Sequence, residues 1–128
     1  MEKIEETTDS IAKQIVDAAY AVHSTLGPGL LESVYEACME HEIRNRGIPL
    51  QRQVVLPVMY KDFRLDAGLR LDLVVSNRVI VELKAVESLM AVHTAQVLTY
   101  LKLTGLRLGL LVNFNVALIK DGIKRIAL

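Results

Sequence analysis

The chain has 128 residues, of which 52% are hydrophobic and 23% charged, and its 15 basic and 15 acidic side chains give a net charge of zero. This composition excludes a disordered chain and predicts one globular domain, residues 1–128, with one core. The zero net charge neither requires nor excludes nucleic-acid binding, which would need the basic side chains gathered on one side.

Cysteine content and hydropathy predict the compartment. The chain has one cysteine, Cys38, which cannot form an internal disulfide and suits a reducing environment. No apolar run reaches the length of a membrane span, and the start, MEKIEETTDS, is acidic and lacks a signal-peptide core. We therefore expect a cytoplasmic protein with no membrane partner.

The first predicted helix follows a lead-in of residues 1–7. Ile11, Ile15, Ala18 and Val22 recur at helical spacing, which predicts an amphipathic helix to about residue 25. Thr8, Asp9 and Ser10 are all suitable N-cap residues, and the sequence does not choose among them. The segment Gly27-Pro28-Gly29 ends this helix.

The second predicted helix runs from about residue 30 to 46 and ends before Gly47. It carries two apolar stripes, one made of Leu30, Leu31, Val34 and Cys38 and the other of Tyr35, Met39 and Ile43. Glu32 falls on the second stripe, where a carboxylate among apolar neighbours is costly to desolvate. A solvated edge shared with Glu36 and Glu40 is the alternative.

The rest of the chain predicts strands around one more helix. We expect strands at residues 53–60, with Pro57 at an edge or a bulge, and at 63–66. A hairpin of residues 69–75 and 79–86 follows, then a helix over 87–104 and a buried strand over 106–113. A last hairpin, 116–119 with 123–127, would turn at Lys120-Asp121-Gly122. This order predicts an α/β fold, a mixed sheet with flanking helices.

The hairpin about Asn77 carries the strongest chemical signal. Counting back from the turn pairs Val75 with Val79 and places Asp72 opposite Glu82. Lys84 then shares a face with Glu82, and Arg70 shares one with Asp72. Opposed side chains have Cβ atoms about 5 Å apart, where two carboxylates repel unless a positive charge lies between them. A hard divalent cation is the strongest candidate for that charge.

These residues suit metal-assisted hydrolysis of a phosphodiester. Asp72 and Glu82 would hold Mg²⁺ or Mn²⁺, and the Leu83 carbonyl would add a third ligand. Lys84 would orient the metal-bound water or neutralise a developing oxyanion. The alternative is a surface hairpin with a cross-strand ion pair, worth roughly 0–1 kcal/mol.

Three motifs resemble those of a known superfamily. Asp72 followed by Glu82-Leu83-Lys84 resembles the core of the PD-(D/E)xK nucleases, although Leu71 stands where many of them have proline. Gln96-Val97-Leu98-Thr99-Tyr100 is similar to the QxxxY motif of the superfamily's recombination-exonuclease branch. Gly29-Leu30-Leu31-Glu32-Ser33-Val34-Tyr35 matches the signature of its GxxExxY family. The resemblance covers Gly29 to Tyr100 and implies a restriction-endonuclease-like fold.

The resemblance also implies residue roles. Glu32 would point toward the metal cluster, and Gln96 would orient Lys84 or a water. Tyr100 would touch a phosphate or a carboxylate, although helix–sheet packing is equally open. His93 is a candidate substrate contact that could instead be structural, and Arg70 belongs to a possible basic rim whose alternative is scattered solubilising charge.

The predicted activity is Mg²⁺- or Mn²⁺-dependent hydrolysis of nucleic acid, with DNA as the first choice. The alternative is a catalytically silent module of the same fold that binds nucleic acid or a protein. The zero net charge favours the help of a partner protein or a homo-oligomer in selecting a substrate.

Overall fold

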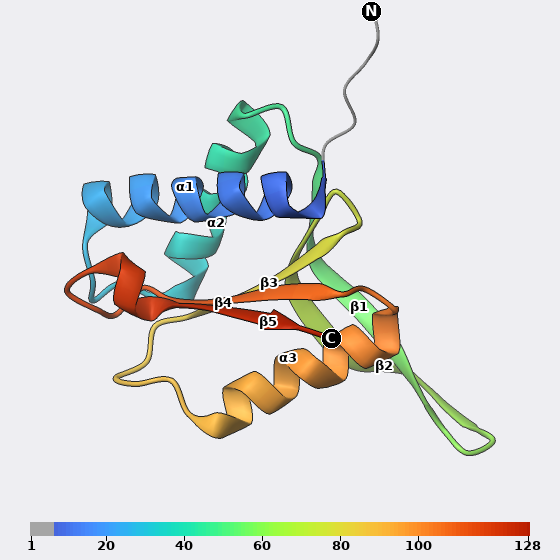
Figure 1. Ribbon diagram of the computed structural model, residues 1–128. Helices are drawn as coiled ribbons and strands as arrows, with labels where there is room; N and C mark the ends of the chain where they lie inside the picture. Colours follow the sequence, from blue (N-terminus) through green and yellow to red (C-terminus); the bar gives the residue numbers. More distant parts are fainter. Residues whose placement is uncertain (1–6) are drawn as a thin grey trace, which may run out of the picture.

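The computed structural model describes residues 7–128 and arranges them as a five-stranded sheet with helices on both faces (Figure 1). The α-helices are α1 (Thr8–Leu26), α2 (Glu32–Asn45) and α3 (Ala91–Thr104), and a short 3-10 helix, η1, covers Ile119–Gly122. The strands are β1 (Leu50–Tyr60), β2 (Phe63–Val75), β3 (Val79–Lys84), β4 (Leu108–Asn113) and β5 (Ile123–Ala127). In these described residues no helix is long and apolar enough to cross a membrane.

The sheet is mixed, as the order of elements predicted. Its strands lie in the order β1-β2-β3-β4-β5. Each neighbouring pair is antiparallel except β3 and β4, which run parallel and are joined through α3. A parallel connection needs a crossover, and the helix provides it. The α/β class expected from the sequence is therefore confirmed.

The sheet separates two hydrophobic clusters. The helices α1 and α2 cover one face, and α3 covers the other (Figure 1). Val79, Val81 and Leu83 on β3 pack toward α1 and α2, whereas Ile80 packs toward α3. This alternation is what a strand buried on both faces produces, and it explains why β3 and β4 are nearly continuous apolar runs.

The two N-terminal helices differ from expectation at their starts. The Thr7 side chain caps α1 by accepting a hydrogen bond from the Ser10 N–H at 3.1 Å, so none of the three expected caps is correct. Gly27 has φ 70° and ends α1, as expected. Leu31 is the N-cap of α2, so the helix begins at Glu32, two residues later than predicted.

Only one of the two expected stripes on α2 is buried. Tyr35, Met39 and Ile43 are fully buried in the core, as predicted. In the first stripe Leu31 is 74% exposed and Leu30 and Val34 are each 39% exposed, so only Cys38 of that stripe packs against the core. The helix can bury only the side that faces the sheet and α1, and tertiary packing selects that side.

β1 and β2 form a long hairpin whose outer part extends beyond the helices (Figure 1). Their register shifts between Leu56 and Val58, at Pro57, which confirms the expected edge position and irregularity. β2 is one strand rather than the two predicted. Gly68 lets β2 pass close to Val58 of β1, because a Cβ at this position would lie 2.7 Å from Val58 Cγ2.

The segment after β4 is not the hairpin that the Asp121-Gly122 pair suggested. Residues 116–119 form no strand, and η1 occupies the position of the expected turn. The His23 Nε2 lies 2.8 Å from the Val116 carbonyl oxygen, so this backbone group is used by α1 and not by a strand. A Cβ on Gly122 would overlap the backbone carbonyl oxygen of Asn113, so the loop folds tightly against the end of β4.

The connection from β3 to α3 is longer than expected. The Asn113 side chain accepts a hydrogen bond from the Val86 N–H and donates one to the Val86 carbonyl, at 3.0 and 2.9 Å. These bonds hold residue 86 outside the sheet, so β3 ends at Lys84. α3 then begins at Ala91 rather than Glu87.

Candidate active site

The site is built where β2 and β3 separate. Their pairing is regular from Val75 and Val79 to Leu73 and Val81, as counting from Asn77 predicted. At the next position, Asp72 and Glu82, side-chain carboxylates take the place of the backbone carbonyls as hydrogen-bond acceptors between the strands. Glu82 Oε1 accepts a hydrogen bond from the Asp72 N–H at 3.0 Å, and Asp72 Oδ2 accepts one from the Leu83 N–H at 2.9 Å. Side-chain hydrogen bonds therefore join the two strands at the point where their backbone–backbone hydrogen bonds end.

The alternation of faces along β2 is interrupted at Asp72. Leu71 packs into the cluster on the α3 side, whereas Leu73, two residues later, packs into the cluster under α1 and α2. On β1, Gln53 lies between the residues paired with Leu71 and Leu73 and has φ 54°, a conformation that side chains rarely adopt. This irregularity turns Asp72 toward the gap between β2 and β3.

The two acids strongly affect each other's protonation. Burial raises the pKa of Glu82 to about 8, and the charge of Asp72 adds to this effect. Burial also raises the pKa of Asp72, while the Leu83 N–H lowers it. A hydrogen bond between the two carboxyl groups raises the pKa of Glu82 and lowers that of Asp72. A pKa of about 8 favours the protonated form of Glu82 near neutral pH, and the two acids titrate as a coupled pair.

Lys84 provides positive charge close to this pair. It follows Glu82 by two residues on β3, and its side chain is half-buried. Its charge lowers the pKa of both Asp72 and Glu82. The lysine and the two acids thus share one electrostatic environment, although burial outweighs the lysine and keeps both carboxyl pKa values raised.

A third carboxylate, which the sequence reasoning did not select, acts on Asp72. Glu36 on α2 is 7% exposed, and its charge raises the pKa of Asp72. Its two oxygens accept hydrogen bonds from Arg52 Nε at 2.6 Å and from Gln53 Nε2 at 2.5 Å. Gln53, with its unusual backbone conformation, thus lies opposite Asp72 in the register and donates a hydrogen bond to Glu36.

Glu32, expected to be the helical acid, has a different position. Its side chain is exposed in the first turn of α2, one turn before Glu36. Within residues 7–128 no group of three or more His, Cys, Asp or Glu side chains is placed to hold a metal ion. The expected convergence of Glu32 with Asp72 and Glu82 is therefore absent, and the two strand acids form a pair.

The QxxxY residues on α3 are divided between surface and core. Tyr100 is 4% exposed and packs in the α3-side cluster. Burial raises its pKa, and the charges of Glu82 and Asp72 raise it further, so the phenol lies near the acid pair. Gln96 is exposed. The structure thus relates Tyr100 to the acids more closely than Gln96.

The other two expected substrate contacts, His93 and Arg70, lie in different surroundings. His93 Nδ1 accepts a hydrogen bond from the Met90 N–H at 2.9 Å, so this histidine caps α3, which was the structural alternative. Arg70 is exposed at the base of the projecting hairpin, two residues before Asp72 on β2. Among residues 7–128 no ion pair engages its guanidinium, whereas Arg64 pairs with Asp66 at 2.6 Å.

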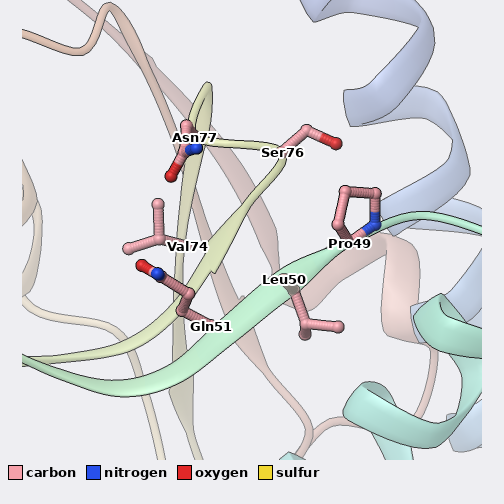
Figure 2. A pocket seen from close by; sticks show the side chains of 6 residues that line it. All are labelled: Pro49, Leu50, Gln51, Val74, Ser76 and Asn77. Atoms are coloured by element: carbon pink, nitrogen blue, oxygen red, sulfur yellow. The ribbon is translucent and has the colours of Figure 1, made fainter.

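A surface hollow of about 230 Å³ lies beside the β2–β3 turn and is separate from these residues (Figure 2). Ser76 and Asn77, both with positive φ, form part of its wall. The complete lining is Pro49, Leu50, Gln51, Val74, Ser76 and Asn77. No acid, base or histidine is among these six residues, so the hollow has no group for acid–base catalysis.

The geometry agrees with a family comparison. A model described as the PD-(D/E)XK nuclease superfamily matches residues 9–126, almost the whole chain, and the chain belongs to this superfamily. The five-stranded mixed sheet with its three helices is the restriction-endonuclease-like fold that the resemblance implied. No significant match was found among curated proteins or among solved structures.

The chemistry of the donor set fits a divalent metal ion. Glu82 is buried and Asp72 half-buried, the pKa of each is raised, and a hard cation can replace the proton that the pair holds. The Lys84 carbonyl accepts a hydrogen bond from the Phe114 N–H on the β4 side. Since successive carbonyls in a strand point in opposite directions, the Leu83 carbonyl points into the gap beside Asp72. Mg²⁺ commonly uses one or two protein carboxylates, with water and substrate completing its coordination.

Proposed function

We propose that this protein is a metal-dependent nuclease that hydrolyses phosphodiester bonds in DNA, and that it belongs to the GxxExxY branch of its superfamily. The observation that carries the proposal is the Asp72–Glu82 pair at the strand separation, with Glu82 buried and Lys84 beside it. A phosphodiester is the substrate class that such a site suits, because a cation and an ammonium both offset charge on a phosphorane-like transition state.

Asp72, Glu82 and the Leu83 carbonyl would hold Mg²⁺ or Mn²⁺. When bound, the ion supplies a water of lowered pKa and a positive charge beside the scissile phosphate. Residue Lys84 orients the attacking water and stabilises the developing negative charge. The buried surroundings of Glu82 strengthen these interactions, because electrostatic attraction is larger where water is excluded.

The outer residues of the site have supporting roles. We assign the helical carboxylate of the site to Glu36 in place of Glu32, since Glu36 is held beside Asp72 by Arg52 and Gln53. Tyr100 on α3 is buried and feels the charges of both acids, and in this proposal it limits the access of water to them. Gln96, His93 and Arg70 would meet substrate only at the rim, with Arg70 the best placed because it is exposed on the strand that carries Asp72.

The second candidate function is a module of the same fold that binds nucleic acid or a protein without turnover. The exposed position of Gln96 and the absence of a three-acid cluster among residues 7–128 favour it over a complete nuclease site. The intact Asp72, Glu82 and Lys84 favour the enzyme. We further propose one domain over residues 1–128 and a cytoplasmic location, for which the single cysteine is the support.

A cleavage assay on linear, nicked, single-stranded and circular DNA, and on RNA, with Mg²⁺ or Mn²⁺ tests the proposal. We expect Lys84→Met and Glu82→Gln each to reduce the rate by about 10²–10³-fold. Lys102→Met, at an exposed lysine of α3, is the matched control and should cleave like the wild type. Equal cleavage by all four proteins would contradict the enzyme. Metal-independent DNA binding without cleavage would support the silent module.

A further inference from the structure

The outer part of the β1–β2 hairpin has one face made entirely of apolar side chains. Cross-strand pairs share a face, and the pairs here are Leu56 with Leu69, Val58 with Leu65 and Tyr60 with Phe63. We define the apolar arm face by these six residues. Tyr60 is 66% exposed, Phe63 63% and Leu65 48%, whereas Leu56, Val58 and Leu69 are half-buried.

This face continues the core on the α3 side outward into solvent. Val54 and Leu69 pack against the cluster that contains Leu71, at the base of the hairpin. Beyond them the hairpin projects past the end of α3 (Figure 1). An isolated two-stranded hairpin is marginally stable in water and needs a covering layer on its apolar face. The exposed fractions show that residues 7–128 of a single chain do not provide that layer.

The charges of the outer hairpin argue against a polyanion as the partner that covers the apolar arm face. The tip, residues 61–66, carries Lys61 and Arg64 against Asp62 and Asp66, so its net charge is zero. Arg64 is already paired with Asp66 at 2.6 Å. The pairs Met59 with Arg64 and Val55 with Arg70 place both arginines on the opposite face. A nucleic acid lying on the apolar arm face would meet one cation of the tip there, Lys61, whose Nζ lies 5.4 Å from the centroid of the Tyr60 ring, whereas a polyanion needs several.

A second copy of this chain fits the same surface. It would present an identical apolar face and an equally neutral tip, so its approach carries no electrostatic penalty. From the exposed fractions and the usual size of aromatic side chains, the face offers on the order of 400 Å² per copy. Two copies with their flanking backbone then reach about 1,000 Å², the lower limit of specific interfaces.

We propose that the apolar arm face is the interface with a second copy of this chain. The two hairpins pack face to face across a two-fold axis, as the layers of a β-sandwich do, with Tyr60 and Phe63 as the central anchors. Because β2 runs without a break from Phe63 to the strand separation at Asp72, the interface is joined to the candidate active site by a single strand. The interface does not depend on whether that site is active.

Sedimentation velocity over a wide range of concentrations tests the interface. The wild type should approach twice the monomer mass of 14.3 kDa at high concentration. The double variant Tyr60→Ser/Phe63→Ser should raise the dimer dissociation constant by at least ~30-fold. Met59→Ser is the matched control, because Met59 is 59% exposed on the opposite face of the same hairpin, and it should dimerise like the wild type.

Circular dichroism should show the same secondary structure for all three proteins, since the altered side chains are exposed. If the double variant fails to fold, Phe63→Ser alone serves the same comparison. A wild type that stays monomeric at every concentration overturns the proposal, and so does an equal weakening by Met59→Ser. A monomeric wild type whose binding to a single-stranded oligonucleotide is lost in the double variant also overturns it and assigns the face to base stacking.

Discussion

The two halves of β2 distribute polar and apolar side chains in opposite ways. Its inner half, residues 71–75, is largely buried, yet it carries the carboxylate of Asp72. Its outer half is exposed, yet it presents Phe63 and Leu65 to solvent. Each arrangement is unfavourable in a single chain by itself, because carboxylates are costly to bury and apolar side chains are costly to expose. The proposed cation at the inner half and the proposed second copy at the outer half would relieve these two costs.

The largest expected difference between the halves is in stability. Leu73→Ala, at a fully buried position, should lower the free energy of unfolding by about 2–5 kcal/mol, because it leaves a cavity in the core. Leu65→Ala, on the same strand and 48% exposed, should lower it by less than about 1 kcal/mol. Urea unfolding at a concentration that keeps the protein monomeric measures both. Equal losses would mean that the hairpin is covered within one chain.

The acid pair should make the metal-free protein less stable as the pH rises. The pKa of Glu82 is about 8 when folded, against 4.5 for an ordinary glutamate, so unfolding between these pH values releases a proton. The free energy of unfolding contributed by Glu82 is therefore fully present below about pH 4.5 and is lost as the pH rises through 8. The total change should be a few kcal/mol at most.

Glu82→Gln should remove most of this pH dependence. Glutamine resembles the protonated acid, so its amide can keep the hydrogen bonds of the pair without a titrating proton. Denaturant unfolding of both proteins across this pH range, with a chelator present, gives the comparison. An unchanged pH slope in the variant would show that Glu82 is not the group whose pKa is raised.

The smallest effect concerns Glu36, the acid whose charge raises the pKa of Asp72. Glu36→Ala should lower the free energy of unfolding by about 1–2 kcal/mol, because it leaves the Gln53 amide and the Arg52 guanidinium without their main partner. Glu40→Ala is the control. It removes a 26% exposed carboxylate whose bonds to Arg44 and Arg52 are 3.2 and 3.3 Å long, and it should cost less than about 0.5 kcal/mol. Thermal unfolding at neutral pH measures the loss of stability in each variant. Similar losses in Glu36→Ala and Glu40→Ala would contradict the importance of the hydrogen bonds that Glu36 accepts from Arg52 and Gln53.

The register of the central hairpin could be predicted because it depends on local order. A turn at Asn77 and a period of two side chains fix which residues face each other, and the pairs from Val75 to Leu73 agree with that count. The same count placed Asp72 opposite Glu82 but could not show that their carboxylates replace the backbone ladder. That replacement depends on the interrupted alternation at Asp72, which has no signature in the sequence of β2.

The choice between Glu32 and Glu36 could not be made from the sequence. The two residues are one helical turn apart, and periodicity gives the faces of α2 but not its rotation about its axis. The rotation is fixed by Tyr35, whose ring stacks on Phe114 at 4.4 Å and whose hydroxyl donates to the Gly27 carbonyl. The partners of Glu36, Arg52 and Gln53, lie on β1, so only the folded chain reveals them.

The C-terminal hairpin of residues 116–119 and 123–127 was predicted wrongly for a similar reason. Asp121-Gly122 is a strong local signal for a two-residue turn, but long-range contacts of the preceding loop override it. His23 on α1 engages Val116, and Phe114 is buried against Tyr35. Local turn chemistry therefore predicted a reversal at the right place and assigned it the wrong form.

Binding of Mn²⁺ followed by thermal unfolding tests the acid pair most directly. Mn²⁺ should raise the melting temperature of the wild type, and more so near pH 8 than well below it, because the ion must displace the proton on Glu82. Glu87→Gln, an exposed control just beyond β3, should respond like the wild type, whereas Glu82→Gln should show no stabilisation by the ion. Stabilisation of Glu82→Gln equal to that of the wild type, or none in the wild type, would contradict a metal site at Asp72 and Glu82.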